Sequence, residues 1–482
     1  MWNSKVFVVL HACYAIFSSG LKTEAEDIYH WKTLEFENLP LPEDSFIGKY
    51  PYYIPENVDV LGLTHHVSSG LIIITAGRLR PGVPSALNAF CTDDFEKGSS
   101  PRIWGFPDYE RNTLKASFYE DSEGSSRALH SNSASVKFYS SGYFNYFFGD
   151  KSEDSSRKLL NKRPYYSHED FTIMAVYSPV IDNNCNRLYV VDTGTLQYTG
   201  IAMYRVQSPA LIVFDLPSDG CIRRQFPVLR RLEIPSHLWK NPMGFIHLTI
   251  DQEPKGSCDD IFIYIPNIFD NTLVVCDYKK GQFWSFTDQS MLPVYAESYM
   301  VFRDYFHYSL PDGIMNVALG YPDKDGNRNA YYAPGASFGQ YVVSTKLLKD
   351  SKHSYKYNPE DYHMLGYRGC NTQIIYQLLD LSTGVMFFGE MQSRRVSCWN
   401  VNTPIRADTI GVVFESEDLH FVSDLTLDSD GNLWIMTDQL PIIFLTENPL
   451  NLTEVNSKIF RVKASEAIRG TVCDISYQAY KK

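Results

Sequence analysis

The chain has 482 residues, with 44 basic and 56 acidic side chains and a formal net charge of −12. Hydrophobic residues make up 44% of it, which is enough for a substantial globular core. The acidic balance argues against a nucleic-acid-binding protein, because the phosphate backbone would repel such a surface. The 33 Tyr and 29 Phe favour strands, on whose pleated surface flat rings pack well.

The first twenty residues predict a secretory signal peptide. Lys5 supplies a positive charge, and the apolar run 6–17 behind it is too short to cross a membrane as a helix. Small residues at 18–20 suit a cleavage site. No other apolar run reaches about 18 residues, so the sequence predicts a secreted, extracellular protein without a membrane span. A buried first strand is the alternative interpretation of this segment.

Short segments with strand character recur along the rest of the chain, separated by Gly, Pro, Asn and Asp. In chain order they are 70–77, 185–194, 210–216, 259–286, 371–391 and 424–438. Three of them, NRLYVVD, PALIVFD and GNLWIMTD, share a turn residue, an apolar strand and a final Asp. Such repetition is typical of propeller blades, so we predict an all-β fold with one β-propeller domain over 21–482. A pair of β-sandwiches is the alternative.

One long segment interrupts this pattern. Residues from Ser117 to Ser156 are rich in serine and in charge, which indicates an insertion with bounds at about 113–168. Within it, VKFYSSGYFNYFF (136–148) is more aromatic than a linker needs. We expect this part to form an extra hairpin or to dock on another surface.

Two short motifs could suggest enzyme or metal chemistry. GASFG (335–339) matches the G-x-S-x-G elbow of α/β-hydrolases, but that elbow requires a helix after it. Val342 and Val343 favour a strand there, so we predict that Ser337 is a loop residue. His65 and His66 adjoin on an expected strand and would point to opposite faces, so they would not share a metal. The sequence predicts neither a metal site nor a cofactor.

Six motifs in a fixed order resemble the insect yellow / major royal jelly protein family. They are YYIPENVDVLG (52–62), RLRPGVPSAL (78–87) continued by RIWGFPD (102–108), CNRLYVVDTG (185–194), LLDLSTGVMFFGEM (378–391), CWN (398–400) and DGNLWIMTD (430–438). The resemblance covers about Trp31 to Phe444 around the insertion, with Tyr189 where the family signature has Trp. It implies the family's fold, which is a six-bladed β-propeller.

The resemblance also implies one disulfide bond, between Cys185 and Cys258, which match family cysteines at the starts of adjacent blades. Eight cysteines follow the signal peptide, and an even number suits an oxidising compartment. Cys221 and Cys276 lie outside the expected family positions and are candidates to pair with each other. The sequon at Asn451 is a candidate glycosylation site.

Three kinds of function follow from the resemblance. Some members act in cuticle, pigmentation, eggshell or nutrition without an agreed chemistry, others are dopachrome-conversion tautomerases of melanin synthesis, and salivary members of blood-feeding insects bind biogenic amines such as serotonin. We expect a non-catalytic factor in cuticle, pigmentation or eggshell biology, with a tautomerase and then an amine-binding carrier as alternatives. Its expected partners are a small aromatic amine or catechol-derived ligand and extracellular matrix components.

The resemblance carries three ligand-binding positions into the funnel of the propeller. Ser423, Asp438 and Leu440 match a Thr, an Asn and a Phe of the amine-binding relatives. Ser423 keeps a hydrogen-bonding group, whereas Asp438 replaces an amide with a charge and Leu440 has no stacking face. These two departures weigh against amine binding, and capping of strand ends is the alternative role of Ser423 and Asp438. A tautomerase would need a general base, for which the acidic candidates are Asp192, Asp438, Glu56 and Glu390.

Overall fold

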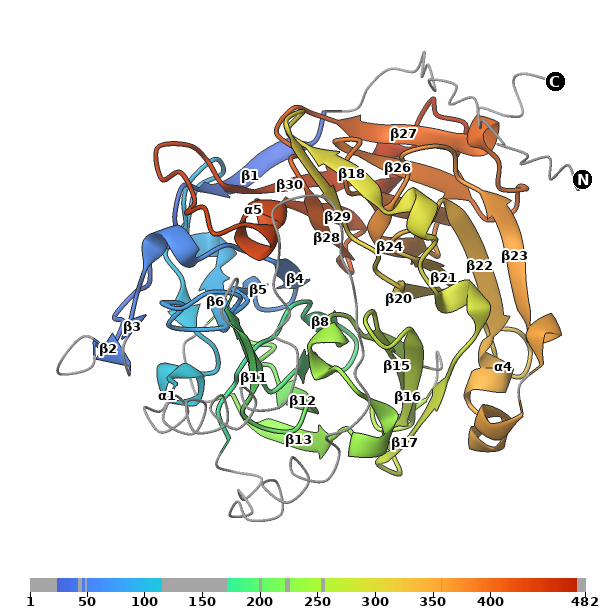
Figure 1. Cartoon of the computed structure of the whole chain (residues 1–482), viewed down its shortest axis with the longest axis horizontal. Helices are drawn as coiled ribbons and strands as arrows, with labels where there is room; N and C mark the ends of the chain where they lie inside the picture. The colour runs from blue at the N-terminus through green and yellow to red at the C-terminus, as the bar shows by residue number, and fades with distance from the viewer. Residues whose placement is uncertain are drawn as a thin grey trace, which may run out of the picture.

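The computed structural model describes residues 24–41, 46–47, 50–114, 171–198, 202–221, 226–252, 256–356 and 358–474. The predicted signal peptide and nearly all of the predicted insertion lie outside these residues. Within them, six four-stranded antiparallel sheets surround a central axis (Figure 1). The predicted six-bladed β-propeller is therefore confirmed.

Each blade is a meander whose first strand lies nearest the axis, against the first strands of its neighbours. The first three blades are β4 (Gly62–His66), β5 (Leu71–Thr75), β6 (Leu87–Cys91) and β7 (Trp104–Gly105); β8 (Val180–Asp182), β9 (Arg187–Asp192), β12 (Ala210–Asp215) and β13 (Val228–Glu233); and β14 (Thr249–Gln252), β15 (Ile261–Asn267), β16 (Thr272–Asp277) and β17 (Gln282–Phe286). The last three are β20 (Ile314–Leu319), β21 (Asn329–Pro334), β22 (Gly339–Ser344) and β23 (Tyr362–Tyr367); β24 (Ile374–Asp380), β25 (Val385–Glu390), β26 (Arg395–Asn400) and β27 (Ile410–Glu415); and β28 (Val422–Leu427), β29 (Asn432–Thr437), β30 (Ser457–Lys463) and β1 (Glu26–Trp31).

Smaller elements decorate the blades. The extra hairpins are β2–β3 (Phe46–Ile47 and Tyr50–Pro51), β10–β11 (Thr195–Tyr198 and Ala202–Arg205) and β18–β19 (Tyr299–Phe302 and Phe306–Ser309). The short α-helices are α1 (Tyr109–Asn112), α4 (Thr345–Leu348), α5 (Leu440–Leu445) and α6 (Ala464–Ala467). None of the helices described is long and apolar enough to cross a membrane.

The middle strands of the blades are apolar on both faces. Every residue of β5 (LIIIT) and of β25 (VMFFGE) is buried. A blade packs against a neighbour on each side, so both faces of its middle strands enter a core, and the sequence reads as a continuous apolar run. One such core lies between the first two blades, and its residues include Ile73, Phe106, Val190 and Phe214.

The ring is closed by the two ends of the described chain. β1 pairs antiparallel with β30, so an N-terminal strand completes the last blade (Figure 1). This strand is not predictable from the sequence alone, because its six residues include two acidic side chains and carry no strong local strand signal.

Three disulfide bonds tie the blades together in the described chain. Cys185–Cys258 is present as predicted and joins the second blade to the third. The others are Cys91–Cys221 and Cys398–Cys473. Pairing of Cys221 with Cys276 was therefore wrong: Cys276 lies on β16 and packs, as a free thiol, in the core between the second and third blades.

Replacing Cys185 and Cys258 together with alanine should lower the free energy of unfolding by about 4 kcal/mol. The bond closes a loop with a sequence separation of 73, and a closed loop of that length restricts the unfolded chain strongly. Denaturant unfolding of the double variant and the wild type would measure the difference. A loss below about 1 kcal/mol would show that the bond adds little to stability.

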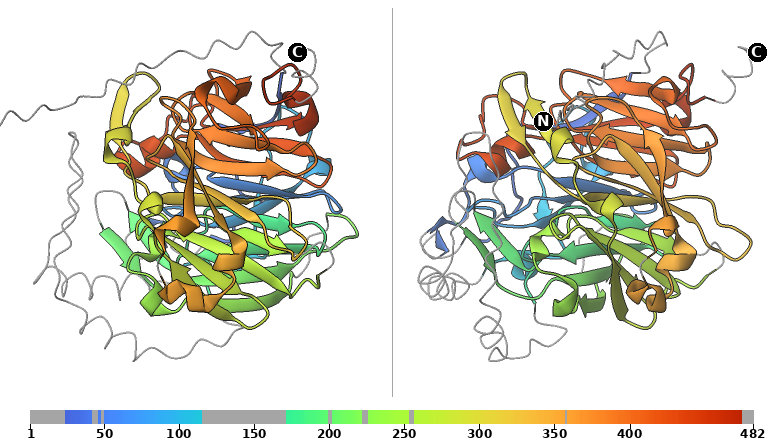
Figure 2. Two further views of the ribbon diagram at one scale, coloured as in Figure 1. Left: turned by 90° about the vertical axis from the view of Figure 1, so that its right-hand side faces the viewer. Right: turned by 45° about the vertical axis from the view of Figure 1, so that its right-hand side comes forward.

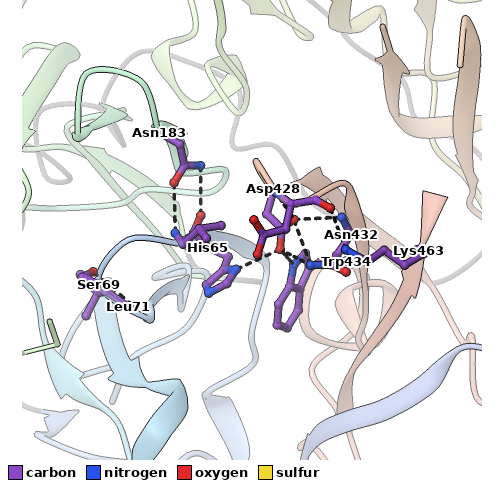
Figure 3. Close-up of polar contacts among 10 residues, drawn as sticks. His65, Ser69, Leu71, Asn183, Asp428, Asn432, Trp434 and Lys463 are labelled. Carbon is purple, nitrogen blue, oxygen red and sulfur yellow. Dashed lines mark hydrogen bonds and ion pairs between the residues drawn. The ribbon is translucent and has the colours of Figure 1, made fainter. Parts of the chain in front are cut away.

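The two adjacent histidines have separate, structural partners. His65 Nδ1 lies 3.1 Å from Asp428 Oδ2, and Trp434 Nε1 donates to the same oxygen at 2.8 Å, which joins the first blade to the last (Figure 3). His66 is buried and its Nδ1 lies 2.7 Å from Ser69 Oγ. The described part of the chain contains no group of three or more potential metal-binding side chains. Each histidine therefore has hydrogen-bond partners of its own within the propeller.

Candidate functional site

A narrow cavity of about 80 Å³ lies in the funnel of the propeller. Its walls are mostly aliphatic and aromatic, with a few polar groups among them. The lining residues are Leu61, Leu79, Tyr177, Ser178, Met243, Ile246, His247, Ile268, Phe269, Leu310, Asp312, Met315, Ile375, Ser423, Leu440 and Phe444. Apolar walls with a small number of polar groups are the usual makeup of a small-molecule site.

Two elements cover this region at one end of the propeller. The β18–β19 hairpin, yellow, and helix α5, red, lie at the same end in both views of Figure 2. Met300, Phe302 and Tyr308 of the hairpin share a hydrophobic cluster with Leu440 and Phe444 of α5. The hairpin and the helix therefore stabilise each other above the cavity.

Asp312 is the most unusual residue of the lining. It is 5% exposed, and its carboxylate has no hydrogen-bond or ion-pair partner in the described chain. Burial raises the pKa of Asp312 to about 7, because no nearby group stabilises the charged form. An unpaired carboxyl in an apolar cavity is costly to the fold, and a cation in the cavity would compensate that cost.

The GASFG stretch holds the backbone of Asp312 in place. The stretch forms the turn between β21 and β22, where the Ala336 N–H donates to the Asp312 carbonyl at 3.0 Å. Gly335 is required there, since a Cβ would come within 3.1 Å of Asp312 Cβ and closer to Met315. Ser337 is buried, and its Oγ accepts from the Gly339 N–H at 3.0 Å. Ser337 is thus a loop residue, as predicted.

His247 is the second polar group without a partner. Neither ring nitrogen makes a hydrogen bond in the described chain, and the ring packs edge-on against Tyr376, 4.8 Å between centroids. Burial lowers the pKa of His247 to about 3, so the ring is neutral at ordinary pH. A neutral imidazole offers a ligand one donor and one acceptor.

The three predicted ligand-binding positions surround the start of α5. Ser423 and Leu440 line the cavity, whereas Asp438 does not and instead accepts from the Leu440 N–H at 2.8 Å. Ser423 Oγ and Asp438 Oδ2 are both buried, and neither makes a hydrogen bond of normal geometry in the described chain. The Ser423 hydroxyl is nevertheless near enough to Asp438 to lower its pKa slightly against the larger effect of burial. Phe444, one helical turn after Leu440, supplies an aromatic face to the cavity.

Asp438 is a fully buried carboxyl. Burial raises the pKa of Asp438 well above its ordinary value, and the neighbouring carboxylate of Asp59 is the second cause of this rise. Burial therefore favours the protonated, uncharged form of this carboxyl.

The other acids considered for a tautomerase lie outside the cavity lining. Asp192 accepts from the Met174, Ala175 and Gly194 backbone N–H groups, which is a structural role. Glu390 is paired with Arg395 at 2.7 Å. Glu56 is half-buried in a short 3₁₀ turn. The carboxylate in the lining is instead that of Asp312, which no sequence motif indicated.

The fold and the cavity define a six-bladed propeller with an axial pocket, and comparisons with known proteins give its family. The family model described as major royal jelly protein matches residues 174–473. The yellow-related salivary protein SP03 of Phlebotomus perniciosus is 30% identical over 474 residues, covering 98% of this chain and 99% of the relative. This chain belongs to the major royal jelly protein family.

Two further relatives match a shorter part of the chain. The yellow-related salivary protein ASP4 of Phlebotomus orientalis is 34% identical over 305 residues, covering 63% of this chain and 74% of the relative. The yellow-related salivary protein LJM11 of Lutzomyia longipalpis is 34% identical over 326 residues, covering 66% of this chain and 77% of the relative. The resemblance to the yellow family that the sequence motifs indicated is confirmed.

Proposed function

We propose that this chain is a secreted, non-catalytic binding protein that holds a small aromatic amine in its axial cavity. The observation that carries the proposal is the unpaired carboxylate of Asp312 among apolar walls. An ammonium group would pair with that carboxylate, and Phe269, Phe444 and Tyr177 offer aromatic faces to the ring. Secretion is supported by the relatives, which are named as salivary proteins.

The biological setting remains a prediction from the resemblance. A factor in cuticle, pigmentation or eggshell biology would meet aromatic amines and catechol-derived compounds, and the cavity chemistry suits both. Extracellular matrix components as partners and a glycan on the exposed Asn451 also remain predictions.

Calorimetric titration with serotonin and with dopamine tests the proposal directly. The wild type should bind at least one of them, and Asp312→Asn should bind it far more weakly. Asp182→Asn is the matched control, because Asp182 is a buried carboxyl at the end of β8 that does not line the cavity. Absence of heat with both amines, or equal loss in both variants, would contradict amine binding.

Amine affinity should rise about tenfold per pH unit from about pH 5 to about pH 7 and then level off. Only the ionised carboxylate of Asp312 pairs with the amine, and burial raises its pKa to about 7, whereas an alkyl ammonium stays charged up to about pH 10. Titrations across this range would measure the slope. In Asp312→Asn the tenfold rise per pH unit should be lost, and a flat wild-type profile between about pH 5 and about pH 7 would refute the role of Asp312.

A tautomerase of the dopachrome-conversion type is the second candidate function. Asp312, with a pKa near 7, is poised to act as a general base, and the neutral ring of His247 lines the same cavity. Dopachrome decay should then be accelerated by the wild type and not by Asp312→Asn. Amine binding without this acceleration would leave the carrier as the function.

A further inference from the structure

Helix α5 forms part of the cavity wall and is held at both ends by buried charged residues. Leu440 and Phe444 lie one turn apart and both line the cavity. After the helix, the guanidinium of Arg80 donates to the carbonyls of Ile442, Ile443, Thr446 and Asn448 at 2.6–3.0 Å. Polar groups therefore hold both ends of the helix, and its apolar side chains pack against two hydrophobic clusters.

Two carboxyl groups hold the start of α5 side by side. The Gln439 N–H donates to Asp59 Oδ2 at 2.9 Å, and the next N–H, of Leu440, donates to Asp438 Oδ1 at 2.8 Å. Asp59 is 3% exposed and Asp438 is fully buried. Two carboxylates this close in a buried place cannot both ionise without a large cost, so the pair retains a proton.

The surroundings of the pair do not supply a full counter-charge. Asp59 also accepts hydrogen bonds from the Val60 N–H and from Ser457 Oγ. The positive charge of Arg80 lowers the pKa of Asp59, but less than burial raises it. Asp438 faces Ser423 and a third buried acid, Asp424. The guanidinium of Arg80 already donates hydrogen bonds to helix carbonyls, and it also interacts electrostatically with Glu447.

The cavity is partly open to solvent and is small for an aromatic amine. Its volume of about 80 Å³ compares with about 150 Å³ in an engineered cavity that admits benzene. An indole or catechol ring is larger than benzene, so part of the wall must move before it enters. Helix α5 is one element of that wall, through Leu440 and Phe444.

We propose that α5 is the gate of the axial cavity, and that one proton retained by the acid pair of Asp59 and Asp438 keeps the gate shut. When the proton leaves to solvent, two adjacent carboxylates repel each other beneath the first turn of the helix. Opening α5 exposes both to water and relieves the repulsion. The shifts in pKa agree with a retained proton. Burial raises the pKa of both acids, and the charge of Asp59 raises the pKa of Asp438 further. The gate regulates the ligand site of the proposed function.

Hydrogen exchange of the ligand-free protein tests the gate without any assumption about the ligand. Peptides spanning 439–446 should lose protection at least about tenfold between about pH 6 and about pH 9, after correction for intrinsic exchange. Helix α4 is the internal reference, since its first turn is capped by Ser344 and not by a buried acid pair. Its protection should stay constant over the same range.

The variant Asp438→Asn tests whether loss of the proton from the acid pair causes the loss of protection in α5. Asparagine keeps the acceptor for the Leu440 N–H and removes the charge, so α5 should stay protected at every pH. Asp182→Asn should behave as the wild type. A constant wild-type profile for α5, an equal fall in α4, or an unchanged fall in Asp438→Asn would each overturn the gate. If titration shows no amine binding but α5 opens as described, the gate stands and the proposed ligand is wrong.

Discussion

Replacing Asp312 with asparagine should weaken the binding of serotonin or dopamine by about 100-fold, or about 2.7 kcal/mol. The carboxylate is buried, has no partner in the described chain, and lies in the lining beside aromatic side chains. Removing the negative charge leaves the ammonium group of the ligand without a counter-ion in an apolar place. Titration calorimetry near pH 8, where the carboxyl is ionised, would measure the loss.

The same substitution should not lower the free energy of unfolding at neutral pH. The folded-state pKa of Asp312 is raised, so the unfolded chain ionises this group at a lower pH than the folded chain does. Its contribution to stability is therefore lost as the pH rises from about 4 towards about 7, and asparagine removes that pH dependence. Loss of both binding and stability would instead indicate a general structural defect.

Replacing Arg80 with methionine should lower the free energy of unfolding by about 3 kcal/mol or more. The buried guanidinium satisfies four carbonyl groups at and after the end of α5, and methionine fills similar volume but cannot donate. Unpaired carbonyls in a buried place are costly. Denaturant unfolding would measure the stability, and exchange of residues 439–446 should rise more than that of the blades.

Arg102→Met is the matched control for Arg80→Met. Arg102 pairs with Glu35, and both side chains are more than 60% exposed, so its loss should change the stability by no more than about 0.5 kcal/mol. Equal effects of the two substitutions would show that Arg80 does not anchor the helix.

The strands of the blades could be predicted because their signal is local. Segments such as 259–286 and 371–391 contain apolar runs bounded by turn residues, and the structure places β15–β17 and β24–β25 there. The Cys185–Cys258 bond and the cavity positions of Ser423 and Leu440 followed from family motifs. The pairing of Cys221 could not be found in this way, because Cys91 is 130 residues distant and no motif relates the two.

The polar residues of the cavity could not be predicted from their own surroundings. Asp312 stands in Pro-Asp-Gly, a sequence typical of an exposed turn. It is buried because the 335–336 turn closes over its backbone. His247, in GFIHLTI, would be assigned to the core, and its lack of a partner becomes visible only when all blades are assembled. Both residues depend on contacts between distant parts of the chain.

The pairing of β1 with β30 imposes an order on biosynthesis. β1 leaves the ribosome before every blade, yet its partner strand is more than 400 residues later in the chain. Until β30 is made, the backbone of β1 has no strand to pair with, although Tyr29 and Trp31 can already pack against Phe90 of the first blade. A nascent chain with such a strand is prone to mispairing. Chaperone engagement of this N-terminal strand is thus expected to last until translation is nearly complete.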